Sequence, residues 1–129
     1  MTRWMVPCNV KKYDIVKDFK KGKLVYFKRN RALVKGDEVY IYVAKPYSEI
    51  KFKGHVVQDT VHLDDVDENN KSFFEKGTTV VIIELDKQFP EGTFRVDELK
   101  RNGLGQVVNQ QIICGKLEKY ILGVEDSLQ

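Results

Sequence analysis

Aromatic and basic side chains gather between residues 27 and 61, and this combination suits the recognition of nucleic acid. Aromatic faces stack on bases, while lysine and arginine hold phosphates. Stacking contributes about 1 to 3 kcal/mol per base, and phosphate contacts add a salt-sensitive attraction. On or beside this stretch stand the aromatic residues Trp4, Phe27, Tyr40, Tyr42 and Tyr47 and the basic residues Lys28, Arg29, Arg31, Lys45, Lys51 and Lys53.

Part of this aromatic set is expected in the core. Tyr40 and Phe52 lie within alternating strand patterns, so we expect both rings to be buried. Phe27, Tyr42 and Tyr47 stand nearer to strand ends and to a turn at residues 44–48. For these three rings a core role and a binding role both remain open.

Groups suited to catalysis or metal binding are sparse. His55 and His62 have no carboxylate or cysteine at metal-ligand spacing, so we expect surface or structural roles for both. The sequence has no nucleophile elbow, no phosphate-binding glycine loop and no paired carboxylates in an apolar setting. Asp37 after Gly36 is typical of a turn. We therefore expect no catalytic residue, no metal and no cofactor.

Length and composition predict one globular domain spanning residues 1–129. The chain is 42% hydrophobic and 32% charged, which is ordinary for a folded domain. Cys8 and Cys114 are expected as small buried hydrophobes in a reducing compartment, with one disulfide as the alternative. No window is long enough to span a bilayer, and the apolar run at residues 4–8 is too short for a signal peptide. A cytoplasmic location is therefore expected.

The charge is unevenly distributed along the chain. Residues 1–53 hold 14 Lys+Arg against 5 Asp+Glu, whereas residues 54–129 hold 8 against 14. Such asymmetry favours a surface that attracts a polyanion, of which nucleic acid is the commonest. The alternative is that the two halves interleave in the fold, which would mix the charges.

The order of apolar patterns and turn signals predicts an α+β domain. We expect strands at residues 4–8, 24–27, 39–43, 50–57, 78–85 and 112–113, the fifth being central, and short helices capped by Asn9, capped by Asp97 and around residues 117–121. Gly103 and Gly123 are expected to end the last two helices. The acidic stretch 63–71 lacks the pattern of a calcium loop and is expected at the surface. About six strands and three short helices indicate a mostly antiparallel, strongly curved sheet that closes a barrel.

The two strands on either side of the turn at residues 44–48 are expected to form a hairpin with distinct faces. In the first, Val39, Ile41 and Val43 alternate with two tyrosines. In the second strand, the residues of the two faces alternate strictly. We expect the apolar face to pack on the core and the opposite face to meet water or a polyanion. The second strand's apolar face is Ile50, Phe52, Gly54 and Val56, and its opposite face includes Lys51, Lys53 and His55.

Several short motifs resemble the EVE domain of the PUA-like superfamily. They are residues 4–9 (WMVPCN), 12–14 (KYD), 27–30 (FKRN), 36–42 (GDEVYIY) and 50–54 (IKFKG), and residues 98–104 and 117–121 are similar to the closing segments of bacterial EVE-type chains. The resemblance covers nearly the whole chain. It implies a PUA-like pseudo-barrel with short flanking helices, related to the YTH fold, and non-enzymatic binding of nucleic acid in which a modified base enters an aromatic pocket.

The resemblance also implies which residues form that pocket. Phe27 stands where many relatives carry a tryptophan. The pocket would draw on Pro7, Cys8 and Asn9, on Phe27, Arg29 and Asn30, and on Tyr42, Lys45, Pro46, Tyr47 and Ser48, with Gln106, Gln110 and Gln111 as a polar loop that reads a base edge. The candidates for holding the nucleic-acid backbone are Lys28, Arg31, Lys45, Lys51 and Lys53.

The leading hypothesis is a cytoplasmic, non-enzymatic reader of DNA or RNA that binds a flipped or unpaired base, modified or unmodified. A second hypothesis is a PUA-like relative of the ASCH type with weak ribonuclease activity. A third is a module for a nucleoside-like small molecule or a protein partner, with acidic residues 64–68 contacting that partner. We expect no membrane partner. The suspects for the ribonuclease would be Lys28, Arg29, Tyr42 and Lys45.

Overall fold

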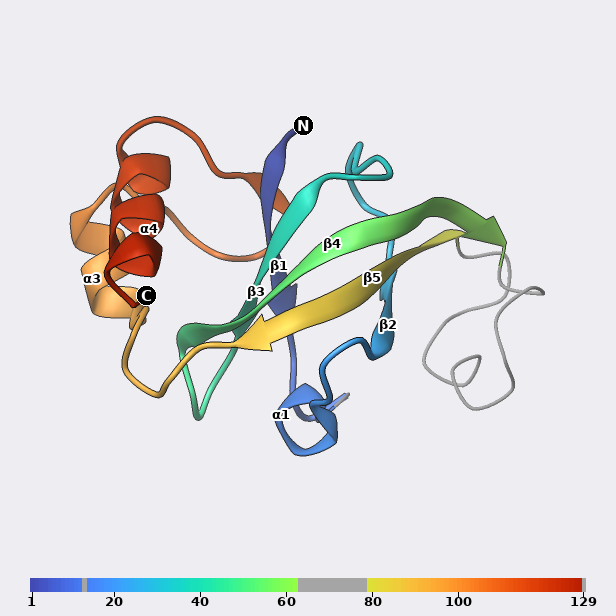
Figure 1. Ribbon diagram of the computed structural model, residues 1–129, viewed down its shortest axis with the longest axis horizontal. Helices are drawn as coiled ribbons and strands as arrows, with labels where there is room; N and C mark the ends of the chain where they lie inside the picture. Colours follow the sequence, from blue (N-terminus) through green and yellow to red (C-terminus); the bar gives the residue numbers. More distant parts are fainter. Residues whose placement is uncertain (13, 63–78, 129) are drawn as a thin grey trace.

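A six-stranded mixed sheet with short helices forms the molecule (Figure 1). The computed structural model describes residues 1–12, 14–62 and 79–128. The strand order is β2-β5-β4-β3-β1-β6, with β1 parallel to β3 and the other neighbours antiparallel. The elements are β1 (Arg3–Cys8), α1 (Ile15–Asp18), β2 (Leu24–Lys28), β3 (Glu38–Val43), β4 (Glu49–His62), β5 (Thr79–Gln88), α3 (Val96–Arg101), β6 (Gln111–Ile112) and α4 (Gly115–Ser127). The predicted α+β class is confirmed.

The sheet is open, and one buried side chain links its two edges. Gln110, which precedes the edge strand β6, is 4% exposed. Its Oε1 accepts a hydrogen bond from the backbone N–H of Asn30 at 3.1 Å, and its Nε2 donates one to the carbonyl of Lys28, the last residue of the other edge strand, at 2.6 Å. The sheet therefore curves until its edges meet through a side chain, whereas the predicted closed barrel would need β2 and β6 to pair.

Each face of the sheet carries a buried core. The alternation in β3 is confirmed, because Val39, Ile41 and Val43 pack in one core while Tyr40 and Tyr42 pack in the other. The prediction that the second face meets water is confirmed only in part. α3 and α4 cover the part that holds Tyr40 and Tyr42 (Figure 1), whereas the side chain of His55 on the same face is 38% exposed. The helical side chains that cover the tyrosines are Leu99, Leu117 and Ile121.

A β-bulge in β4 breaks the alternation predicted for that strand. Ile41 of β3 pairs with Phe52, but the next residue, Tyr42, pairs with Ile50, so Lys51 is an extra residue. Ile50 therefore joins the core beneath the helices, while Phe52 stays in the opposite core. The alternation rule fails here because each bulge residue reverses the faces of the residues on one side of it.

A buried ionic cluster fixes α4 to the sheet. The Tyr40 hydroxyl donates a hydrogen bond to Oε1 of Glu125 at 2.5 Å. The ammonium groups of Lys53 and Lys87 each lie 2.7 Å from Oε2 of Glu125. Burial opposes ionisation of this carboxyl group, yet the hydrogen bonds from Lys53, Lys87 and Tyr40 lower the pKa of Glu125 to about 2. The carboxylate is therefore ionised and fully partnered at neutral pH.

Several predicted element ends differ in the structure. The cap of α1 is Asp14, whose Oδ1 accepts from the N–H of Lys17 at 3.1 Å. Asn9 instead accepts from the N–H of Lys11 at 3.0 Å and forms a turn after β1. α3 has no side-chain cap. α4 continues past Gly123, because the free-energy cost of a glycine within a helix is smaller than the cost of losing the packing of that helix against the sheet. β5 lies beside the edge strand β2 and is not central, although it is buried on both faces as predicted.

Asp37 has the structural role that its position after Gly36 predicts. The carboxylate is 2% exposed and accepts hydrogen bonds from the N–H groups of Thr2 and Val34 and from Nε1 of Trp4. These bonds hold the pKa of Asp37 below its usual value although burial acts in the opposite direction. Asp37 therefore joins the start of β1 to the turn before β3.

Candidate functional site

A cleft opens where the parallel strands β1 and β3 end. It consists of two adjoining hollows of about 640 and 450 Å³, which share Lys45, Val107 and Val108. These volumes fall in the range of sites for small organic groups. The cleft is open to solvent, since Val108 is 82% exposed. The larger hollow is also lined by Tyr42, Val96, Lys100 and Gln106, and the smaller by Pro7, Cys8, Asn9, Lys11 and Ala44.

Backbone hydrogen bonds hold the walls of the cleft. The N–H of Ala44 donates to the carbonyl of Cys8 at 3.1 Å, which joins the ends of β3 and β1. The N–H of Val96 donates to the carbonyl of Ser48 at 3.0 Å, so the start of α3 is tied to the turn after β3. The third wall follows Leu104, whose N–H donates to the carbonyl of Leu99 at 3.0 Å. Three segments distant in sequence are thus fixed around one cleft.

The polar groups of the cleft suit binding better than nucleophilic attack. Burial raises the pKa of the Tyr42 phenol, although a hydrogen bond with Ser48 acts in the opposite direction. Burial, together with the charge of Asp14, also raises the pKa of the Cys8 thiol to about 12. Both groups are therefore protonated at neutral pH. The cleft offers a phenol and the amides of Asn9 and Gln106 as hydrogen-bonding groups.

Three lysines border the cleft, namely Lys11, Lys45 and Lys100. All three are exposed, and none forms an ion pair with another described residue. An ammonium group without a carboxylate partner is available to an external anion. The cleft therefore has a cationic rim around an interior that is partly apolar.

Several residues predicted for a base pocket line this cleft, and others lie elsewhere. Phe27 and Tyr47 are partly buried against the core that contains Phe52, so they do not form an aromatic cage with Tyr42. Arg29 donates from Nη2 to the carbonyl of Leu33 at 3.1 Å. Of the predicted set, Pro7, Cys8, Asn9, Tyr42, Lys45 and Gln106 line the cleft, Ser48 bonds to Tyr42, and Phe27, Arg29, Asn30, Pro46 and Tyr47 are not among its lining residues.

The predicted backbone-binding cations divide into two groups. Lys28, Arg31 and Lys45 are exposed. Lys51 is only 6% exposed, and its ammonium lies 3.9 Å from the carboxylate of Glu49 and over the ring of Tyr47. Lys53 is bound to Glu125, so neither of these two presents a free charge to a phosphate as predicted.

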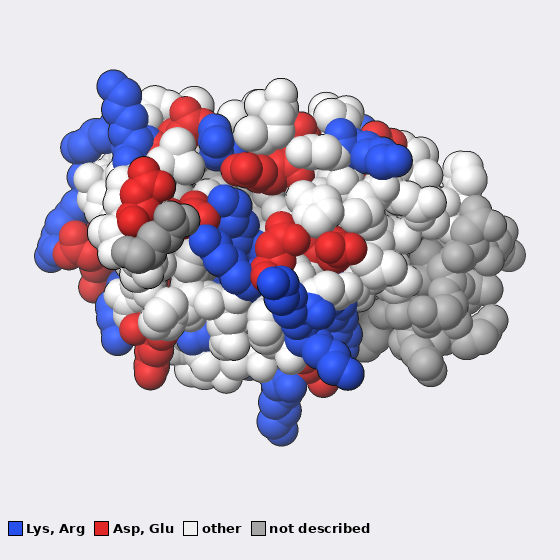
Figure 2. All heavy atoms as spheres, viewed as in Figure 1, with Lys and Arg blue, Asp and Glu red and all other residues white. Residues whose placement is uncertain are grey.

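The fold brings some of the basic residues of the first half of the sequence next to acids of the second half. Cations of the first half pair with acids of the second, as Arg3 does with Glu118 at 3.1 Å and Lys53 with Glu125. Figure 2 shows the two signs intermingled on the face in view, without a large patch of either. This agrees with the alternative that the two halves of the sequence interleave and mix their charges. The lysines at the cleft are therefore a local group of positive charges and not part of a large basic surface.

The predicted polar loop also divides. Gln106 lines the cleft, whereas both amide groups of Gln110 are used to link the sheet edges. Gln111 lies in β6 and donates from Nε2 to the carbonyl of Gln106 at 3.2 Å. Gln110 therefore does not read a base edge as predicted, because its side chain is buried and both its Oε1 and its Nε2 already form hydrogen bonds within the protein. The acidic stretch 64–68 proposed for a protein partner lies outside the described residues.

Sequence reasoning missed half of the cleft. Val96 and Lys100 belong to a helix whose pattern indicated only packing, and Val107 and Val108 lie in a segment without a strand or helix signal. Ala44 directly precedes the predicted Lys45, and Lys11 lies two positions after the predicted Asn9, so inclusion of two flanking positions would have found both. Neither cysteine is in a disulfide, but Cys114 is exposed at the start of α4 and not buried as expected.

The sheet is thus open, curved and mixed, with α3 and α4 packed on one face and α1 on the other. Solved structures of other proteins share this fold. The ASCH protein of Zymomonas mobilis superposes with a TM-score of 0.68 at 10% identity over 95% of this chain and 94% of its own. A protein of Rhodopseudomonas palustris superposes with a TM-score of 0.68 at 16% identity, over 100% of this chain and 96% of its own. A protein of Agrobacterium tumefaciens superposes with a TM-score of 0.59 at 12% identity, over 98% of this chain and 92% of its own.

These likenesses confirm the expected PUA-like fold but not the EVE family within it, since the neighbour named for its domain is an ASCH protein. No family profile and no curated protein matches the sequence. Within the described residues, no helix has the length and apolar character needed to cross a membrane.

Proposed function

We propose that the protein is a non-enzymatic module that binds single-stranded RNA, with one unpaired base in the cleft between β1, β3 and residues 106–108. The observation that carries this proposal is the composition of the cleft. A partly apolar interior with amides and a phenol is surrounded by three lysines that have no ion-pair partner among the described residues. Unpaired RNA requires such a combination of apolar walls, hydrogen-bonding groups and cations.

The larger hollow suits the base itself. Tyr42, Val96 and Val107 offer the apolar and aromatic surface, and the exposed amide of Gln106 can donate to or accept from a base edge. Among the described residues, Tyr42 is the one aromatic side chain that lines the cleft, so the base would insert between a ring and aliphatic groups instead of entering a cage of rings. The aliphatic wall would also accept a methyl group, and preference for a modified base is therefore part of the proposal.

Phosphates would be held at the rim. Lys45 lies between the two hollows and is the best placed cation for the phosphate next to the inserted base. Lys11 and Lys100 border one hollow each and would contact the phosphates on either side. The exposed Lys28 and Arg31 would extend this path beyond the cleft.

The ribonuclease alternative has less support from the geometry. Tyr42 and Lys45 line the cleft, but Lys28 and Arg29, the other two suspects, do not. A protonated phenol and a protonated thiol do not act as bases or nucleophiles at neutral pH.

Fluorescence anisotropy with labelled oligonucleotides tests the proposal. Single-stranded and duplex RNA and DNA, with and without methylated bases, are titrated at low and moderate salt. We expect single-stranded RNA to bind best and Lys45→Ala to weaken binding about threefold to tenfold, with the salt slope reduced by about 1. Lys35→Ala, an exposed lysine before the opposite end of β3, is the matched control and should bind as the wild type does.

Two results would overturn the proposal. Equal losses in Lys45→Ala and Lys35→Ala would show that the attraction is a general charge effect and does not involve the cleft. Cleavage of the labelled RNA, lost in Tyr42→Phe, would favour the ribonuclease.

Gln106→Ala, compared with Gln58→Ala on the exposed part of β4, should change the preference among bases more than the affinity for a homopolymer.

A further inference from the structure

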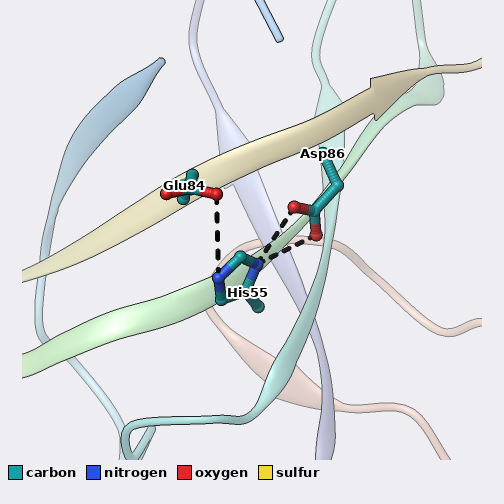
Figure 3. A group of neighbouring side chains, drawn as sticks. All are labelled: His55, Glu84 and Asp86. Atoms are coloured by element: carbon teal, nitrogen blue, oxygen red, sulfur yellow. Dashed lines mark hydrogen bonds and ion pairs between the residues drawn. The ribbon is translucent and has the colours of Figure 1, made fainter. Parts of the chain in front are cut away.

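Three polar side chains on neighbouring strands form a compact cluster away from the cleft (Figure 3). His55 belongs to β4, and Glu84 and Asp86 belong to β5. Each offers one ligand atom within 4.8 Å of the others. His55 pairs with Glu38 at the start of β3, whereas the cleft lies at the end of that strand, roughly 13 Å further along. The cluster is thus separate from the proposed RNA site.

Two irregularities of the backbone bring these side chains together. Lys53 pairs with Lys87 and Gly54 with Leu85, so Asp86 is the extra residue of a bulge in β5. A Cβ at Gly54 would lie 2.4 Å from the Glu84 carbonyl oxygen, so glycine is required for the strands to approach this closely. His55 and Glu84 are direct cross-strand partners, which sets their side chains next to each other.

The hydrogen bonds of the cluster determine which imidazole nitrogen is available. Nδ1 of His55 lies 3.0 Å from both carboxylate oxygens of Asp86, while Nε2 lies 3.9 Å from Oε2 of Glu84 (Figure 3). With Asp86 accepting a hydrogen bond from Nδ1, a neutral His55 carries its lone pair on Nε2. Two acceptors, the lone pair and the Glu84 carboxylate, then face each other, and either a proton or a metal cation between them removes the mismatch.

The spacing is close to that of a metal pair. Zn²⁺ binds imidazole nitrogen and carboxylate oxygen at about 2.0 to 2.2 Å, so two tetrahedral ligands lie roughly 3.4 Å apart. The observed 3.9 Å separation needs a side-chain movement of only about 0.5 Å. Ligating histidines commonly donate their second N–H to a carboxylate, which is the position of Asp86.

Neighbouring charges do not compete for the cluster. Glu38, the partner of His55 on β3, has its Oε2 at 2.9 Å from Nε of Arg3. Lys53 of β4 and Lys87 of β5, which pair across the strands next to the bulge, are both bound to Glu125. The carboxylates of Glu84 and Asp86 therefore face the imidazole without a lysine or arginine bound to either among the described residues.

We infer that His55 and Glu84 bind a divalent transition-metal cation of the Zn²⁺ class, through Nε2 of the imidazole and the Glu84 carboxylate, with Asp86 positioning the imidazole. Their side chains are 38% and 39% exposed, so water completes the coordination. Imidazole with carboxylate favours such a cation over Ca²⁺ or Mg²⁺, which prefer oxygen ligands alone.

Calorimetric titration of ZnCl₂ into the metal-free full chain at pH 7 tests the inference, with ¹⁵N chemical shifts of the imidazoles as a second readout. We expect one site whose affinity falls at least tenfold in His55→Ala and in Glu84→Gln. His62→Ala, on the exposed end of the same strand, is the matched control and should retain it. In the wild type, Zn²⁺ should shift Nε2 of His55 while Nδ1 stays protonated.

The positioning role of Asp86 has its own signature. In Asp86→Asn the affinity should fall about tenfold, and Zn²⁺ should distribute between the two imidazole nitrogens because the tautomer is no longer fixed. Equal binding by His55→Ala and the wild type would overturn the inference, as would Zn²⁺ shifts confined to His62 or to residues beside the exposed Cys114. The wild-type shifts decide the matter even if a variant fails to fold.

Discussion

Lys53 and Lys45 come from the same basic stretch of sequence, but the fold gives them opposite roles. Lys53 lies 2.7 Å from the Glu125 carboxylate, which also binds Tyr40 and Lys87 under α4. Lys45 stands exposed between the two hollows of the cleft without an ion-pair partner among the described residues. A count of basic residues in the sequence therefore does not locate a binding surface, because only cations without an ion-pair partner are available to hold an external anion.

Loss of the shared acid should have the largest effect on the ionic cluster. Glu125→Ala leaves two ammonium groups and a buried phenol without their common partner, and we expect it to lower the free energy of unfolding by about 3 kcal/mol. Urea unfolding at pH 7 measures this loss. Asp126→Ala, the exposed neighbour on α4, should change it little. A loss of RNA affinity in a folded Glu125→Ala protein would contradict the separation of the two regions.

The same cluster should make stability depend on acid pH. The pKa of Glu125 is about 2 in the folded protein against an ordinary value of 4.5, so its contribution is complete above pH 4.5 and is lost as the pH falls toward 2. Over this window the stability difference between the wild type and Glu125→Gln should shrink by about 2 kcal/mol. Urea unfolding at a series of pH values checks this. A constant difference would mean that the carboxyl group has no special partners.

Gln110 tests whether the link between the two edges of the sheet stabilises the fold. Gln110→Ala leaves the carbonyl of Lys28 and the N–H of Asn30 without their partner, and we expect a loss of about 1.5 kcal/mol. Gln111→Ala removes a single bond to the carbonyl of Gln106 and should cost about 0.5 kcal/mol or less. Thermal unfolding measures both variants. A larger loss in Gln111→Ala would contradict the role of Gln110 as the link between the edges.

The smallest expected effects separate the two lysines themselves. Lys53→Ala should lower stability by about 1 kcal/mol and leave RNA affinity unchanged, since Lys87 still partners Glu125. Lys45→Ala should change stability by less than about 0.5 kcal/mol and reduce RNA affinity. Unfolding and anisotropy measurements on the same samples compare them. If both variants lost affinity equally, the ionic cluster would belong to the binding surface.

Local patterns in the sequence determined the fold class and much of the strand layout. The alternation of valine and tyrosine in β3 sets the two faces of that strand, and the period of two acts over a few residues, so it survives in the folded chain. The resemblance to EVE chains implied a pocket at the ends of the first strand and of the tyrosine strand, and five of the residues that it named there line the cleft, namely Pro7, Cys8, Asn9, Tyr42 and Lys45. Strand ends can be recognised in sequence because turn-forming residues mark them.

Contacts between distant residues were decided only by the tertiary structure. Lys53 and Glu125 are 72 positions apart, Asn30 and Gln110 are 80 apart, and His55 and Asp86 are 31 apart. All three depend on the strand order, and the contact of His55 with Asp86 depends also on a bulge that shifts the register by one residue, and no local propensity fixes these. The physical reason is that a side chain's charge and hydrogen-bonding capacity belong to its residue type, whereas the partner that satisfies or frees them is supplied by the register of the sheet.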